Sequence, residues 1–131
     1  MPLKTKMWVT PAEPDDGYRA LVCRYRPRAL PKAKETWDVW IRDLGPSPAL
    51  FDAFRGKGQR AISLAEYRER YSKEMEGQRE KIAELAARLD RGENVTLLCS
   101  KDCFIPEACH RTTLAHLVEA ARQSPAKAPP R

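Results

Sequence analysis

The sequence predicts an α/β fold, a three-layer sandwich around a small, mainly parallel sheet. Short apolar runs that suit strands alternate with longer stretches in which apolar residues recur every three or four positions, as on one face of a helix. The clearest run, Val95 to Cys99, is continuous and β-branched at its start, which is typical of a central parallel strand. The 131 residues suit one domain with one core.

Composition divides the chain into three parts. Residues 1–17 are predicted to hold a first strand, from Lys4 to Val9, and a connection rich in proline, aspartate and glycine. Residues 18–122 are predicted to form the single α/β domain. Residues 123–131 are predicted to be a disordered basic tail rich in proline and alanine.

The first half of the domain is predicted to hold a strand and two helices. Arg19 to Tyr25 is predicted to be a buried strand that ends at Pro27, because proline cannot donate to the hydrogen-bond ladder. The next apolar residues have the spacing of one helix face: Trp37, Trp40, Ile41 and Leu44. Ser47 then suits the N-cap of a second, short helix, with Pro48 at its first position.

The second half is predicted to hold a long helical region, the clearest strand and a last helix. Ser63 and Glu66 match the pattern of a capping box, and Gly77 predicts a kink or break in the apolar stripe that follows. After the Val95 strand, a final helix is predicted from its apolar residues: Leu114, Leu117, Val118 and Ala121.

The positive charge is concentrated in one segment. The chain has 24 Lys and Arg against 18 Asp and Glu, a formal net charge of +6. Six basic and no acidic residues lie between Tyr18 and Lys34: Arg19, Arg24, Arg26, Arg28, Lys32 and Lys34. An anionic partner near this segment is therefore expected, and a solvated basic edge is the alternative.

Several classes of protein are excluded or disfavoured. No apolar run is long enough for a membrane helix, and the first residues lack the apolar stretch of a secretory signal, so a cytoplasmic protein with no membrane partner is expected. The four cysteines are accordingly interpreted as reduced thiols. No GxGxxG or GxxxxGK[ST] loop is present, which argues against a common dinucleotide or nucleoside triphosphate site, and no cofactor is predicted.

The segment from Cys99 to Arg111 is the candidate site. It joins the carboxyl end of the best strand to the last helix, and ligands of open α/β sheets bind beyond the carboxyl ends of the strands. Cys109, at the helix start, is predicted to be a nucleophile with His110 as its acid or base. The expected ligand is a small anion, for example a nucleotide-like molecule, and the residues expected to bind it are Arg111, Arg24, Arg28 and Cys99.

Three alternatives stay open. Cys109 can be a small buried core residue, with His110 capping the loop. Cys99, Cys103 and Cys109 offer a less favoured zinc or thiol redox site. The segment 19–34, with two tryptophans nearby, can serve a nucleic-acid-binding or regulatory module, although the tryptophan spacing favours core positions.

Several motifs occur in the order found in one family. They are Arg19 to Arg28, Trp37 to Trp40, Gly45 to Ser47, Tyr71 to Met75 and Val95 to Cys99. Over about residues 18–122 the chain resembles the YeaO-like proteins, which belong to domain of unknown function 488. Cys23, Arg26 and Ala29 stand where that family has Asp, Trp and Gly, whereas Cys109-His110-Arg111 resembles the signature of another branch. The resemblance implies a three-layer α/β fold and a shared pocket, and it implies no particular substrate.

Overall fold

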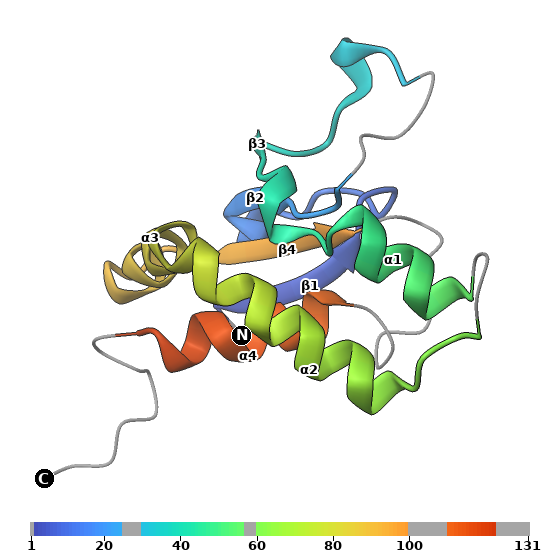
Figure 1. The fold of residues 1–131 in the computed structure, drawn as a ribbon. Helices are drawn as coiled ribbons and strands as arrows, with labels where there is room; N and C mark the ends of the chain where they lie inside the picture. The colour runs from blue at the N-terminus through green and yellow to red at the C-terminus, as the bar shows by residue number, and fades with distance from the viewer. Residues whose placement is uncertain (1, 25–29, 57–59, 100–109, 123–131) are drawn as a thin grey trace, which may run out of the picture.

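The four strands of the described chain form one parallel sheet (Figure 1). The structure is a computed structural model that describes residues 2–24, 30–56, 60–99 and 110–122. The strands lie in the order β1-β4-β2-β3, with bounds β1 Leu3–Met7, β2 Tyr18–Leu21, β3 Val39–Trp40 and β4 Val95–Cys99. The helices are α1 Pro48–Arg55, α2 Leu64–Met75, α3 Arg79–Asp90 and α4 His110–Ala120. The predicted α/β fold with a small parallel sheet is confirmed.

One face of the sheet carries the main core. Alternate side chains of a strand point to opposite faces, so Ala20 and Leu97, which lie in register on adjacent strands, share a face. Every α-helix contributes buried residues to this cluster, among them Leu50, Tyr71, Leu85 and Leu114. The α-helical layer therefore lies against one side of the sheet.

The other face is covered by short 3-10 helices and irregular segments. Leu21, Leu98 and the two cysteines at the strand ends pack there with Trp8 and Trp37, whose rings meet edge to face at 6.1 Å between centroids. The 3-10 helix η1, Pro14–Asp16, also lies on this side, because Thr96 of the central strand donates to the Asp16 carbonyl at 2.9 Å. Irregular structure thus makes the third layer.

The helix predicted for residues 37–44 is wrong. That segment forms β3 and the 3-10 helix η3, Arg42–Leu44. The backbone of its first part bonds to β2, with Asp38 N–H donating to the Arg19 carbonyl at 2.7 Å and Ile41 N–H to the Leu21 carbonyl at 2.8 Å. Trp40, expected in a core, is 37% exposed, and its indole N–H donates to the Cys23 carbonyl at 2.9 Å. Pairing with a neighbouring strand overrides the helical spacing here.

The predicted N-caps and the break at Gly77 are confirmed, and of the predicted capping box at Ser63 the structure shows the serine half. Ser47 and Ser63 are N-caps whose hydroxyls accept the backbone N–H three residues later, at 3.2 Å and 3.1 Å. Gly56 ends α1 in the left-handed region, with φ at 76°. Gly77 lies in the 3-10 helix η4, Glu76–Gln78, which separates α2 from α3 at the predicted break.

In the described part of the chain, no helix is both long enough and apolar enough to cross a membrane.

Candidate functional site

A thiol, an imidazole and a backbone carbonyl meet at the carboxyl edge of the sheet. Cys99 is the last residue of β4, His110 is the first of α4, and Val22 directly follows β2. The Cys99 sulfur lies 3.9 Å from His110 Nδ1, and His110 Nε2 lies 2.8 Å from the Val22 carbonyl oxygen. Because a carbonyl can only accept, Nε2 carries a proton, and Nδ1, which is the basic nitrogen when the imidazole is neutral, faces the sulfur.

Tyr71 holds the imidazole from a third side. Its ring centroid is 5.5 Å from that of His110, with the planes tilted by 58°. The tyrosine is fully buried, and its hydroxyl donates to the Leu44 carbonyl at 2.5 Å. His110 is therefore fixed by a hydrogen bond and an aromatic contact, in an environment that excludes most water.

Arg111 is buried beside this group. It follows His110 in the first turn of α4 and is 5% exposed. Neither its Nε nor its Nη1 has a hydrogen-bond partner among the described residues. Arg88 also has a buried, unpartnered Nε, but its Nη1 pairs with Glu93 and its guanidinium stacks on Tyr18. Among the described residues, Arg111 is thus a buried cation at this helix end with two nitrogens that make no hydrogen bond.

Arg24 has partners within the chain. Its Nε donates to the Pro46 carbonyl at 3.1 Å and its Nη2 to the Gly45 carbonyl at 3.0 Å. Its Nη1 lies 3.5 Å from the Asp43 carboxylate. These contacts join the end of β2 to the turn after η3.

Of the other predicted site residues, Arg28, Cys103 and Cys109 lie outside the described residues.

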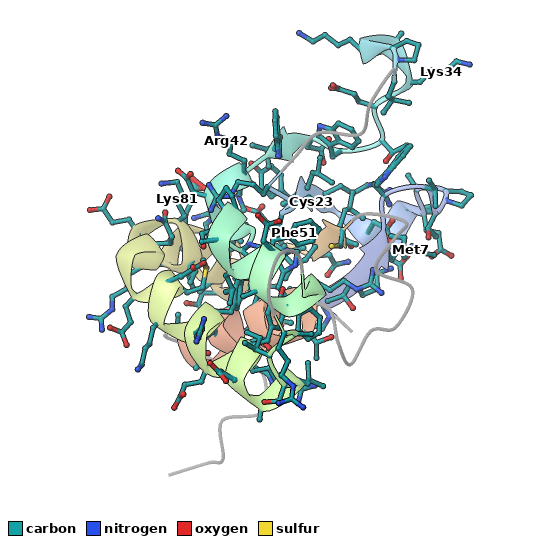
Figure 2. All side chains as sticks on the ribbon, turned by 45° about the vertical axis from the view of Figure 1, so that its right-hand side comes forward. Met7, Cys23, Lys34, Arg42, Phe51 and Lys81 are labelled. Carbon is teal, nitrogen blue, oxygen red and sulfur yellow. The ribbon has the colours of Figure 1, made fainter. Side chains whose placement is uncertain are left out.

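The basic segment does not form one continuous surface. Arg19 is buried and ion-paired with Asp16, and its Nε donates to the Thr36 carbonyl at 2.6 Å. Lys34 lies at the outer end of an arm that extends away from the sheet, far from Cys23 (Figure 2). The charge that the sequence places in one segment is therefore divided between an internal ion pair and an exposed arm, as far as the described residues show.

Sequence reasoning missed a buried ion network on the irregular face. Asp16, 1% exposed, accepts from the ammonium groups of Lys4 at 2.7 Å and Lys6 at 2.8 Å, and it pairs with Arg19. Burial raises the pKa of Asp16, but hydrogen bonds from the lysines, the Glu13 N–H and the arginine outweigh it and hold that pKa well below its ordinary value. The signal in the sequence is the alternation of Lys4 and Lys6 on one face of a strand.

The same network accounts for an acidic cluster. Glu13, Asp15 and Asp16 place carboxylate oxygens within 4.8 Å of one another, close enough to share a cation. Lys4 binds Asp15 at 3.1 Å, and Lys6 binds Glu13 at 2.6 Å, so ammonium groups already supply positive charge to all three. The cluster is explained by these ion pairs.

Comparison with known proteins agrees with the fold and the motifs. The family model described as "Active DUF488-N3 subclade" matches residues 3–122. The chain is 35% identical over 100 residues to "Uncharacterized protein YeaO" of Escherichia coli (strain K12), an alignment that covers 76% of this chain and 84% of that protein. No solved structure matches. The chain therefore belongs to the YeaO-like family of domain of unknown function 488.

Proposed function

We propose that the protein binds a small anionic molecule, bearing a phosphate or carboxylate group, at the carboxyl edge of its sheet, with Arg111 as the charge partner. The observation that carries the proposal is the burial of a guanidinium whose Nε and Nη1 lack partners among the described residues. An unpaired buried charge costs several kcal/mol, on the order of the penalty for breaking a buried ion pair. An oxyanion would offset that cost with charge-assisted hydrogen bonds.

The position of Arg111 supports the same ligand chemistry. It lies in the first turn of α4, an eleven-residue helix whose N-terminal end carries partial positive charge. That helix end adjoins the carboxyl end of β4, where parallel α/β sheets bind ligands. Two independent sources of positive potential therefore favour an anion at this edge.

An enzyme is favoured over a passive binder. The family model that matches this chain is described as that of an "Active" subclade. In this chain, an oriented imidazole adjoins the proposed anion site, and a fixed imidazole suits proton transfer. Cys109 as a nucleophile, with Arg24 and Arg28 as further anion ligands, remains a prediction from the sequence.

The test is an anion titration of the full-length protein. Thermal unfolding is followed in increasing inorganic phosphate or acetate, with chloride at matched ionic strength as the reference. We expect phosphate or acetate to raise the unfolding midpoint of the wild type, and Arg111→Met to abolish the rise.

Arg122→Met is the matched control. Arg122 lies just after the other end of α4, its side chain is 5% exposed, and it is paired with Asp90 at 3.3 Å and Glu119 at 3.4 Å. This variant should be less stable but should keep the full anion response. Equal stabilisation of wild type and Arg111→Met by phosphate and acetate would overturn the proposal.

A further inference from the structure

We infer that Cys99 is the reactive thiol of this site and that His110 Nδ1 accepts its proton. The inferred substrate class, an electrophile that carries an anionic group, rests on the proposed function. The assignment of the thiol rests on a separate observation, the 3.9 Å approach of the Cys99 sulfur to His110 Nδ1.

The arrangement has the three parts of an activated nucleophile. Such a site needs a nucleophile near a base, and a third group that orients the base. Here the base is His110, and the Val22 carbonyl, 2.8 Å from Nε2, is the orienting group. With its proton held on Nε2, the imidazole offers only Nδ1 as a base, and Nδ1 faces the sulfur.

The proton step is balanced within the site. The Cys99 S–H bond breaks, its proton moves to Nδ1, and its electron pair stays on sulfur as a thiolate. The resulting imidazolium donates from both nitrogens, to the thiolate and to Val22. When the thiolate bonds to an electrophilic carbon, the leaving group departs with its bonding electrons, and the imidazolium can return the proton to it.

Cys23 shows why Cys99 is singled out. Both are buried cysteines outside any disulfide of the described residues, at the carboxyl end of a strand or just beyond it. Among the described residues, however, Cys99 alone of the two is paired with a histidine. A buried thiol without an activating partner is inert, so Cys23, 7% exposed against 1% for Cys99, serves as a buried internal reference.

The experiment is competitive alkylation of the full-length folded protein with iodoacetamide, followed by peptide mass mapping of all four cysteines. The reaction forms the sulfur–carbon bond and releases iodide. We expect Cys99 to react at least tenfold faster than Cys23 at pH 7. We also expect its rate to reach half-maximum at a pH below the value of about 8.5 that is typical of a free thiol.

His110→Gln tests the base. The glutamine amide can still donate to the Val22 carbonyl but has no basic nitrogen, so we expect Cys99 to react about tenfold more slowly at pH 7. His116→Gln, an exposed histidine on the same helix, should leave the rate unchanged. If His110→Gln is not folded by circular dichroism, the pH profile of Cys99 in the wild type decides alone.

The outcomes separate this inference from the proposed function. Faster labelling of Cys103 or Cys109 than of Cys99, or an ordinary thiol pH profile at Cys99, would overturn the inference. Iodoacetate, which is anionic, tests the substrate class. It should be favoured over iodoacetamide at Cys99 in the wild type but not in Arg111→Gln. A fast, His110-dependent Cys99 without that preference would leave the thiol assignment standing and contradict the anion site.

Discussion

The imidazole of His110 and the carbonyl of Val22 form a 2.8 Å hydrogen bond although 88 positions separate the two residues in the chain. The bond ties the first turn of α4 to the residue that follows β2, across the carboxyl edge of the sheet. It also decides the chemistry of the imidazole, because the nitrogen bound to the carbonyl must carry the proton. The nitrogen that remains faces Cys99.

Substitution of two buried arginines near opposite ends of α4 should change the free energy of unfolding in opposite directions. Arg111 has unpartnered nitrogens among the described residues, whereas Arg122 pairs with two carboxylates. In buffer without added oxyanions, Arg111→Met should stabilise the protein by about 1–3 kcal/mol, and Arg122→Met should destabilise it by a similar amount. Urea unfolding of both variants checks this. Destabilisation of the same size by both would show that Arg111 is paired within the chain.

The Asp16 network should be essential to stability. Asp16→Asn leaves Arg19 buried without a counter-charge and should cost about 3–5 kcal/mol in the free energy of unfolding. Asp15→Asn is the control, because Asp15 is exposed and pairs only with Lys4 among the described residues. Asp15→Asn should change the free energy of unfolding little. Equal losses of stability in the two variants would contradict the network as described.

The pH dependence of the same network has a definite sign. The pKa of folded Asp16 is lowered, so the folded state binds fewer protons than the unfolded state and stability rises with pH through this window. The contribution of Asp16 is fully present above its unfolded pKa, about 3.9, and is lost as the pH falls below it. The free energies of unfolding of wild type and Asp16→Asn should therefore converge as the pH falls below about 4. A constant difference between pH 7 and pH 2 would contradict this.

Two glycines with different surroundings give a steric test. A Cβ at Gly45 would lie 2.4 Å from the Arg24 backbone nitrogen, whereas at Gly77 it would meet nothing within 4 Å. Gly45→Ala should cost about 1–3 kcal/mol, because the backbones of the turn and of the β2 end must separate. Gly77→Ala should be neutral or stabilise by up to about 1 kcal/mol. Thermal unfolding distinguishes them, and equal effects would refute the close approach at Gly45.

The two serine N-caps should differ in strength. Ser63 accepts one backbone N–H, whereas Ser47 also donates through its hydroxyl to Glu74 of α2 at 2.5 Å, with its own N–H bound to that carboxylate at 2.9 Å. Ser63→Ala should cost about 1 kcal/mol, the usual value for a cap. Ser47→Ala should cost about 2 kcal/mol, because the carboxylate also loses a donor. Chemical denaturation should give a larger loss for Ser47→Ala, and the reverse order would contradict the contact with Glu74.

Local signals in the sequence determined two helix starts, the break between α2 and α3, the central strand and the edge where a site was expected. Ser47, Ser63 and Gly77 act through neighbours within a few positions, so their effects are readable from contiguous residues. The strand Val95–Cys99 was likewise predicted from its own residues. Cys99, His110 and Arg111 were singled out by their position between this strand and the last helix.

Tertiary structure decided what each of these residues pairs with. Residues 37–44 have helical spacing, but hydrogen bonds to β2 make part of them a strand. The sequence placed Arg19 in the basic segment, but in the fold Arg19 is buried and paired with Asp16. Among the described thiols, Cys99 lies beside His110, eleven positions away, and the carbonyl that orients His110 is 88 positions away. Such contacts depend on strand order and register, which are set by burial of the whole sheet and not by any one segment.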